Sequence, residues 1–518
     1  MAALPSSGHN CLTRSVTQIW QVLPLVPPDP EYWSPYSGTD AHCGNPLLVS
    51  LELLVDDGLL RASELPQRQP VAAARFPEYA AEATQLLATA ADRLLQAGPT
   101  SPAGVRVLRA EFAQWRADPT VASWLEPAAL FDAIQHSGEE ETHRVPWWTW
   151  PAPLRERQPA ALVQARAKLS HAVDRFCAIQ FFFDAQWRRL KRYCNGHGIA
   201  LVGDMPIYVG ADSADVWCRP QLWTLGSEVS GTPPDAFSET GQLWGSPLYD
   251  WAEHEKEGYA WWSSRMARAL ALHDEVRIDH FRGLAGYWAV PADAETALSG
   301  KWRVGPGRAF FDALQRNLSP DGTRLPIVAE DLGVITADVV ELRQAINAPG
   351  MAVLQFAWDG NGKNPHLPHN HSSNAFVYTG THDNETTAGW FQARPCSLPL
   401  CCCACELTAR CVTQTTTEND RTNFKAYLGA EDDSAFDPAW AAMRLAMLSV
   451  ARTVVVPMQD VLRLDNSARM NTPGVAAGNW TWRLGPEGCW AQLVRSWACT
   501  RIASARACTD FVCLSTQV

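Results

Sequence analysis

Carboxylic acids stand at or just after the ends of four short apolar segments, where a buried β-strand would expose its last residue. The four acids are Asp204 in IALVGDMP, Asp279 in VRIDHF, Glu330 in PIVAED and Asp383 in AFVYTGTHD. One such acid is commonly a helix cap or a turn former, and this alternative stays open for Asp204. Four acids at one rim would repel one another, so packing alone does not account for them. They suit glycoside chemistry, in which one carboxylate attacks the anomeric carbon and a second, protonated, donates to the leaving oxygen.

Arg277 and the tryptophans fit the same chemistry. Arg277 stands two residues before Asp279, so both side chains of a strand would point to one face and the guanidinium could hold the carboxylate ionised. The chain has 23 tryptophans, and a flat indole beside carboxylates suits a sugar, whose C–H face stacks on the ring. Filling of the core is the alternative for most of these rings.

The segments that must position these acids alternate with helix-like stretches. Seven apolar segments are expected to be strands, at residues 19–25, 199–206, 276–281, 326–331, 351–356, 375–383 and 453–460. Their continuous β-branched runs indicate strands buried on both faces, as in a parallel sheet covered by helices. This pattern predicts an α/β fold of the (β/α)8 barrel type. Nothing before Thr17 has the pattern of an eighth strand, so the first barrel strand is expected to be missing.

Insertions interrupt the barrel, which is expected to span residues 18–484. Residues 53–194 are expected to form a largely helical subdomain, with amphipathic stretches at 79–96, 105–116 and 159–192. Residues 395–422 contain six clustered cysteines and have no helical or strand period. They are either an exposed loop or an insertion of foreign sequence, and we favour the insertion. Residues 485–518 are expected to be an atypical C-terminal tail.

Composition excludes several classes of protein. Acidic residues outnumber basic ones, 55 against 43, and no basic stripe offsets this, so a nucleic-acid partner is not expected. No apolar run approaches the roughly 18 residues needed to cross a bilayer, and the start of the chain lacks an apolar signal-peptide core. Neither a membrane nor a secreted protein is therefore expected. The 15 cysteines lack zinc-ligand spacing, so no metal or other cofactor is expected.

The motifs, taken in order, resemble the 4-alpha-glucanotransferases of glycoside hydrolase family 77, also called amylomaltases or disproportionating enzymes. The matching segments, between residues 20 and 484, are WQVLPL, SPYS, GNPLL, GDMPIYV, DSADVW, GTPPDAFSETGQLWGSPLYDW, VRIDHFRGL, AEDLG, NPHLPHNH, YTGTHDNETTAGW, PMQDVL, RMNTPG and GNWTWRL. The resemblance implies a retaining enzyme that moves α-1,4-glucan segments between maltooligosaccharides by double displacement. The variants LVPPDP and SPYSGTD are similar to the plant and algal plastid branch, which implies the plastid stroma, with the cytoplasm as the alternative.

Carried over by motif, the resemblance implies a role for each candidate residue. Asp279 would be the nucleophile, Glu330 the acid/base, and Asp383 the carboxylate that binds donor-sugar hydroxyls and stabilises the oxocarbenium-like transition state. The donor subsite would be completed by Arg277, His382 and Asp204. Further glucan contacts are expected from Ser34, Tyr36, Gln242, Trp244 and Asn471. Residues 231–251 would form a flexible lid, although packing of that loop is the alternative for Trp244.

Two other functions stay open. Water competes with the acceptor hydroxyl for the glycosyl-enzyme, so the same carboxylates would serve a hydrolase of the α-amylase type. The family-wide match, lid included, favours transfer. The second alternative is a glucan-binding relic without activity, which the missing strand favours and the intact carboxylates disfavour.

Three histidines close together in the sequence raise the question of a metal site. His366, His369 and His371 resemble a metal cluster, but the motif NPHLPHNH is typical of this family without a catalytic metal. A monomer and a homodimer are both compatible with the sequence.

Overall fold

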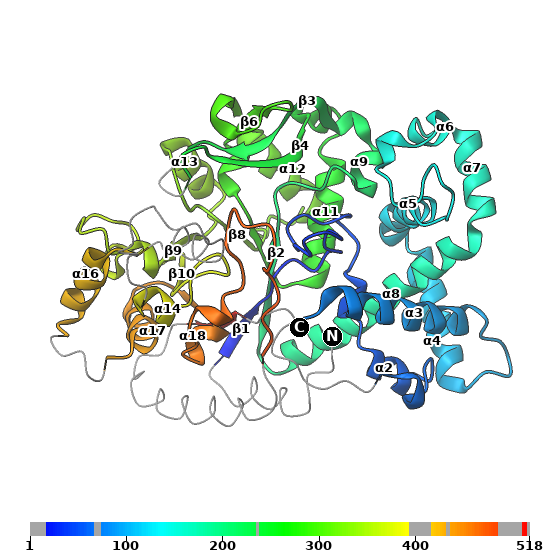
Figure 1. Cartoon of the computed structure of the whole chain (residues 1–518), viewed down its shortest axis with the longest axis horizontal. Helices are drawn as coiled ribbons and strands as arrows, with labels where there is room; N and C mark the ends of the chain where they lie inside the picture. Colours follow the sequence, from blue (N-terminus) through cyan, green and yellow to red (C-terminus); the bar gives the residue numbers. More distant parts are fainter. Residues whose placement is uncertain are drawn as a thin grey trace, which may run out of the picture.

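Eight parallel strands form the centre of the computed structural model, which describes residues 17–66, 74–234, 238–392, 416–430, 436–484 and the backbone of 510–514 (Figure 1). In spatial order the sheet runs β8-β5-β2-β1-β12-β11-β10-β9, and every neighbouring pair is parallel. The strands are β1 (Thr17–Gln21), β2 (Ala200–Met205), β5 (Glu275–Ile278), β8 (Ile327–Ala329), β9 (Gly350–Val353), β10 (Ala375–Tyr378), β11 (Thr453–Pro457) and β12 (Asp510–Leu514). All seven strands predicted from the sequence are present.

The eighth strand comes from the C-terminal tail. Strand β12 lies between β1 and β11, with Val512 opposite both Ile19 and Val455. The backbone N–H of Ala329 donates to the carbonyl of Pro349 at 2.9 Å, which joins β8 to the residue before β9 and closes the barrel. The expectation that the barrel lacks a strand and keeps open edges is therefore wrong. The short apolar run DFVCL supplies the strand at the other end of the chain.

Burial of the barrel strands on both faces explains their apolar composition. In β11 the side chain of Val455 packs inside the barrel with Val202 and Phe376. Its neighbours Val454 and Val456 point the other way, into a separate core that includes Trp390 from helix α14 (Thr387–Gln392). Successive strand residues alternate between faces, so both cores need apolar residues at consecutive positions.

The part of the sequence that connects β1 to β2 is mainly helical and lies on the right of Figure 1. They are α2 (Leu51–Asp56), α3 (Phe76–Leu95), α4 (Ala103–Ala117), α5 (Pro119–Gln135), α6 (Ala152–Arg155), α7 (Pro159–Lys168) and α8 (Ser170–Gly196). Helices α3 and α4 lie close to their predicted positions, whereas the single helix expected at 159–192 divides at Leu169 into α7 and α8. Helix α5 is absent from the prediction, because its residues are largely buried and lack a one-sided apolar pattern.

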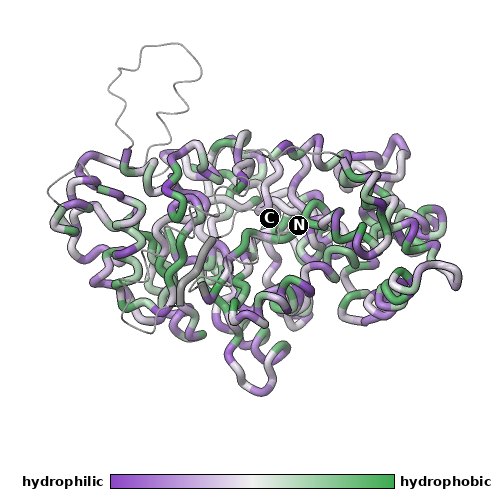
Figure 2. The backbone as a smooth tube through the Cα atoms, turned by 90° about the horizontal axis from the view of Figure 1, so that it is seen from below, coloured by the Kyte–Doolittle hydropathy of each residue, from purple (hydrophilic) through white to green (hydrophobic). Residues whose placement is uncertain are grey.

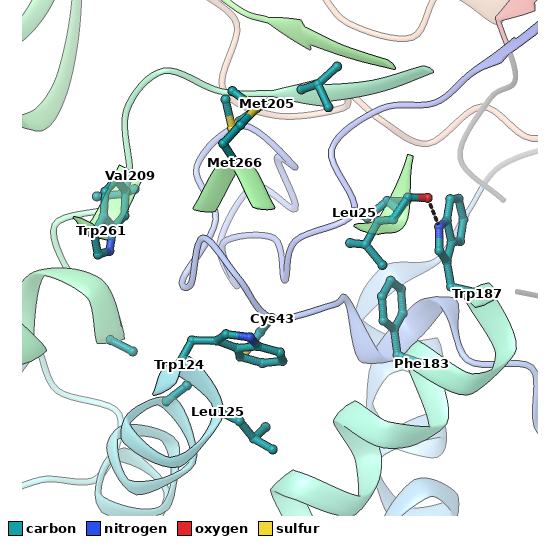
Figure 3. Close-up of a cluster of buried hydrophobic side chains, with 14 of the residues drawn as sticks. Leu25, Cys43, Trp124, Leu125, Phe183, Trp187, Met205, Val209, Trp261 and Met266 are labelled. Carbon is teal, nitrogen blue, oxygen red and sulfur yellow. Dashed lines mark hydrogen bonds between the residues drawn. The ribbon is translucent and has the colours of Figure 1, made fainter. Parts of the chain in front are cut away.

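A shared aromatic core joins these helices to the barrel (Figure 3). Trp124 from α5 and Trp187 from α8 lie in one cluster with Met205 of β2 and Met266 of α11 (Ala260–Leu272). The indole N–H of Trp187 donates to the carbonyl of Leu272 at 2.7 Å. Core filling is therefore the correct interpretation for many of the tryptophans. Among the most deeply buried are Trp150, Trp187, Trp217, Trp262 and Trp390.

An antiparallel sheet, not predicted from the sequence, lies at the top of Figure 1. It has the order β4-β3-β6-β7 and consists of β3 (Trp223–Thr232), β4 (Gln242–Tyr249), β6 (Gly286–Pro291) and β7 (Lys301–Val304). Residues 231–232 and 242–249 of the segment expected to be a flexible lid lie in the paired strands β3 and β4, in which Gly231 lies opposite Leu243.

The remaining helices cover the barrel or connect its strands. They are α9 (Ala214–Cys218), α10 (Trp251–Lys256), α12 (Gly307–Leu318), α13 (Ala337–Ala345), α16 (Glu418–Leu428), α17 (Pro438–Leu448) and α18 (Met458–Val461). In Figure 2 the outline of the molecule is largely hydrophilic, while hydrophobic stretches run through its interior. Within the ranges that the structure describes, no helix combines the length and the apolar character required to span a bilayer.

The segment 395–422, expected to have no regular structure, contains the start of a helix. Thr417 caps helix α16 in a reciprocal capping box with Asp420, so ordered helix begins at Glu418. Residues 395–415, which hold the six clustered cysteines, lie outside the described residues, as do 485–509 and 515–518 of the tail.

Candidate active site

Three neighbouring barrel strands bring acidic residues together at their carboxyl ends. Asp204 at the end of β2 lies opposite Arg277 of β5. The next strand, β8, is in register with β5, and the N–H of Glu330 donates to the carbonyl of Ile278 at 3.1 Å. Asp279 and Glu330 therefore each follow the last paired residue of adjacent strands, which is the rim where barrel enzymes place their chemistry.

Arg277 joins two of these carboxylates. Its Nη1 donates to both oxygens of Asp204, at 2.6 and 2.7 Å, and its Nη2 lies 2.9 Å from Oδ1 of Asp279. Burial disfavours the charged guanidinium, but the carboxylates Asp204 and Asp279 outweigh it and hold the pKa of Arg277 well above its usual value. Asp204 is thus a partner of the arginine rather than a helix cap.

The two carboxyl groups nearest the predicted bond cleavage are both reluctant to ionise. Burial raises the pKa of Asp279 to about 8, opposed by Arg277 and reinforced by Asp204 and Glu330. Burial likewise raises the pKa of Glu330, although its carboxylate accepts two backbone N–H bonds, from His280 at 2.7 Å and from Leu332 at 2.8 Å. At neutral pH this pair can therefore retain a proton, as general acid catalysis requires.

Asp383 lies beyond the end of β10, where Asn471, His382 and Arg469 contact it. The side-chain amide of Asn471 donates to its Oδ1 at 2.6 Å, and Nε2 of His382 lies 3.3 Å from the same oxygen. Arg469 donates to the backbone carbonyl of Asp383 at 2.7 Å. Almost half of the Asp383 side chain remains exposed, so the carboxylate is oriented but still open to a ligand.

Tyr36 contacts both Asp204, the partner of Arg277, and His382, the neighbour of Asp383. Its hydroxyl donates to Oδ2 of Asp204 at 2.7 Å, and its ring stacks on His382 with the centroids 5.0 Å apart. Trp480 also packs against Tyr36, and the centroids of their rings are 5.7 Å apart. Burial raises the pKa of Tyr36 well above its usual value, with the charge of Asp204 adding to it, so the phenol remains a hydrogen-bond donor.

The other predicted glucan contacts lie at different distances from this centre. Trp244 of β4 contacts the ring of His280, next to Asp279, with the centroids 4.8 Å apart in a T-shaped arrangement. Gln242 accepts a hydrogen bond from the Trp244 indole at 3.2 Å. Ser34 accepts from the backbone N–H of Tyr36 at 3.2 Å and so shapes the loop that carries the tyrosine.

A cleft opens beside His382. Its walls come from the segments that follow β1, β10 and β11, and from the loop before Asn471. The lining residues are Leu23, Thr381, His382, Asn384, Glu385, Thr386, Pro457, Gln459, Arg469 and Met470. Their mixture of amide, carboxylate and apolar groups is suited to a neutral polyhydroxyl ligand.

Sequence reasoning missed two residues of the site, Arg469 and Trp480. Both stand inside motifs that were noted for other reasons: Arg469 two residues before Asn471 in RMNTPG, and Trp480 in GNWTWRL. The i, i+2 spacing of Arg469 and Asn471 was an available signal. The contact of Trp480 with Tyr36, 444 positions away in the chain, had none.

The histidines of NPHLPHNH have other partners. Nδ1 of His366 accepts from the N–H of Val353 at 3.1 Å, and Nε2 of His371 lies 2.9 Å from the carbonyl of His366. His369 lies 2.9 Å from the hydroxyl of Tyr427. In the described part of the chain, no group of three or more His, Cys, Asp or Glu residues could hold a metal ion.

Comparisons with known proteins agree on one family. The profile of Glyco_hydro_77, described as 4-alpha-glucanotransferase, matches residues 9–487. The 4-alpha-glucanotransferase DPE1, chloroplastic/amyloplastic, of Oryza sativa subsp. japonica is 48% identical over 474 residues, or 90% of this chain and 73% of the relative. The 4-alpha-glucanotransferase of Thermus thermophilus is 40% identical, over 90% of this chain and 87% of the relative. Among solved structures, the amylomaltase from Streptococcus agalactiae in complex with acarbose has a TM-score of 0.81 and 29% identity, covering 95% of this chain and 94% of that one.

Proposed function

Because the chain belongs to the 4-alpha-glucanotransferases of glycoside hydrolase family 77, which act on α-1,4-glucans, we propose that it transfers them by a retaining double displacement at Asp279, Glu330 and Asp383. The observation that carries this assignment is the Arg277 guanidinium, which bridges Asp204 and Asp279 beside Glu330. One fixed cation thereby orients the attacking carboxylate at the strand ends.

The roles of Asp279 and Glu330 follow from their surroundings. Asp279 keeps 28% of its side chain exposed and is paired with Arg277, which favours the ionised form that attacks the anomeric carbon. Glu330 is buried and, among the described residues, forms no ion pair with an arginine, so we assign the proton of the pair to Glu330. It protonates the leaving oxygen in the first step and takes a proton from the acceptor hydroxyl in the second.

Asp383 serves the donor sugar. The hydrogen bond from Asn471 and the neighbouring His382 fix one of its oxygens, and the other can accept sugar hydroxyls. Such hydrogen bonds strengthen as positive charge develops on the ring in the transition state. Tyr36, with its hydroxyl on Asp204, would close the same subsite from the side of β2.

Transfer, rather than hydrolysis, requires that a sugar reach the glycosyl-enzyme before water does. Trp244 and Gln242 stand on the hairpin β3–β4, and the Trp244 ring against His280 supports a glucan lying over the reacting atoms. An acceptor sugar stacked there would displace water from the intermediate.

The experiment is incubation with maltotriose alone. A 4-alpha-glucanotransferase converts it to glucose and a ladder of longer maltooligosaccharides, because the enzyme holds a glycosyl unit until an acceptor arrives. Glucose and maltose without longer products would establish the hydrolase alternative, and no products would establish the relic.

We also propose that this chain functions in a plastid. The relatives from Oryza sativa subsp. japonica, Solanum tuberosum and Arabidopsis thaliana are described as chloroplastic/amyloplastic, and 48%, 46% and 45% of their aligned residues are identical to this chain. Import of the full translation product into isolated chloroplasts is the test. Recovery of the protein only outside the organelle would favour the cytoplasm.

A further inference from the structure

An exposed tryptophan stands on the edge strand of the antiparallel sheet. Trp302 of β7 has 45% of its surface exposed, and Val304, two residues along the same face, has 87%. Large apolar side chains exposed singly need no explanation. Here two of them share one face of a strand that, within the described ranges, has a neighbouring strand on one side only.

The indole of Trp302 is held in place by its neighbours. The guanidinium carbon of Arg282 lies 3.9 Å from the ring centroid, and Trp288 of β6 packs against the ring in a T-shaped contact at 5.3 Å. Trp288 is itself fixed, because its indole N–H donates to the carbonyl of Ala297 at 2.9 Å and its ring packs against Gly300. A Cβ at Gly300 would lie 2.1 Å from Nε1 of Trp288, so this close contact requires glycine. The exposed ring is therefore packed against Arg282 and Trp288 without any ligand.

Arg282 ties this surface to the active site. It follows Asp279 by three residues, is nearly buried, and donates from Nη1 to the carbonyl of Val334. Val334 follows Glu330 by four residues, and 56% of its surface is exposed. One guanidinium thus underlies Trp302 and connects the loop of the proposed nucleophile with that of the proposed acid/base.

We propose that Trp302, Val304 and Val334 form an outer platform that binds the distal part of an α-1,4-glucan chain whose other end occupies the active site. A glucose unit presents an apolar C–H face that stacks on a flat ring, and no charge that the platform would have to neutralise. The inference rests on the proposed action on glucans and adds a dependence on chain length.

The test compares short and long substrates in the Trp302→Ala variant of the full chain. Maltotriose is too short to occupy the active site and the platform together, so its kcat and KM should stay unchanged. For maltoheptaose and longer glucans, KM should rise about three- to tenfold with kcat unchanged, as the loss of one aromatic stacking contact implies. Unchanged KM values for both lengths, or equal rises for both, would refute the platform.

Matched variants separate stacking from general damage. Trp302→Phe keeps a flat ring and should keep most of the affinity for maltoheptaose. Trp148→Ala removes a tryptophan of similar exposure, 46%, in the helical region, and should leave both substrates unaffected. An equal loss in Trp148→Ala would overturn the assignment to Trp302. Normal disproportionation of maltotriose by each variant shows that the proposed function itself holds, so failure of the two proposals can be told apart.

Discussion

At the scale of single residues, the site is organised around one cation. Arg277 contacts Asp204 and Asp279 directly, and its charge also acts on Glu330. A lysine would not be equivalent, because the planar guanidinium directs a different nitrogen to each carboxylate, whereas an ammonium has a single nitrogen. The geometry therefore pairs Asp279 with a cation, and the proposed roles place the proton on Glu330.

This division of roles predicts different behaviour for two isosteric variants. Asp279→Asn should lower the transfer rate by about 10³-fold or more and should form no covalent glycosyl-enzyme, because the nucleophile is gone. Glu330→Gln should lower transfer by about 10²–10⁴-fold. It should nevertheless accumulate a glycosyl-enzyme from an α-maltosyl fluoride donor, whose leaving group needs no proton. Mass spectrometry of the quenched proteins makes the comparison, and equal trapping in both variants would reverse or void the assignment.

The raised pKa of Asp279 also predicts a pH-dependent cost in stability. In the unfolded chain an aspartate ionises near pH 4, whereas burial raises the pKa of folded Asp279 to about 8. Between these values the unfolded chain loses the protons of both Asp279 and Glu330, whereas the folded pair keeps one proton between them, so the pair destabilises the fold increasingly as pH rises. Asp279→Asn removes this effect. Its Tm relative to the parent should be roughly 4 °C higher at pH 8 than at pH 4. A constant difference across that range, measured by calorimetry, would contradict the argument.

The sequence predicted the acids of the site far better than their partners. The Arg277–Asp279 contact follows from the two-residue period of a strand, which is local information. The hydrogen bond from Tyr36 to Asp204 spans 168 positions, and only the family resemblance placed these residues together. Neither the strand period nor the family resemblance indicated Trp480.

At the scale of elements, hydrogen bonds of the buried Asp460 join α18 to the end of β10 and to the start of α14. Asp460 in α18 accepts hydrogen bonds from the hydroxyls of Thr379, after β10, and Thr387, at the start of α14, both at 2.6 Å. It also accepts from the backbone N–H of Thr387 at 2.7 Å. Since Asp383 lies in the loop between these two threonines, these hydrogen bonds fix both ends of the loop that carries the third carboxylate.

Removing these hydrogen bonds should weaken the fold measurably. Asp460→Ala leaves the two threonine hydroxyls and a backbone N–H without a partner in a buried site, and should lower the free energy of unfolding by about 2–4 kcal/mol. Asp465→Ala is the control, because that acid caps a short exposed turn through Ser467 and its loss should cost less than about 1 kcal/mol. Urea unfolding distinguishes them, and equal losses would show that Asp460 has no special role.

Elements with a simple pattern were predicted and those without one were not. The seven strands are continuous apolar runs that need only their own composition to be recognised. The strands of the antiparallel sheet contain Gly, Ser and Trp, and β7 is exposed throughout, so nothing local distinguishes them from loops. Helix α5 contains Pro127 in its interior and is buried on several sides, which removed the amphipathic signal.

At the scale of the whole molecule, the barrel depends on pairing between the two ends of the sequence. Strand β12 completes the sheet between β1 and β11, so its partners are some 490 and 60 residues away along the chain. Parallel partners this remote carry no turn or spacing signal in the sequence. That is why the sequence predicts a barrel that lacks one strand. The position of β12 corrects this prediction.

Deleting residues 510–518 should therefore restore the behaviour expected of an incomplete barrel. With β12 removed, β1 and β11 expose unpaired backbone N–H and carbonyl groups, which invite pairing with other chains. The truncated protein should be mostly aggregated in size-exclusion chromatography, with little transfer from maltotriose, whereas the full chain should be soluble and active. Val512→Pro tests the same pairing with a single change, because proline has no N–H to donate in the middle of a sheet, and Val512→Thr, which keeps the N–H, is its control. A truncated chain that stays soluble and active would mean that another segment closes the barrel between β1 and β11.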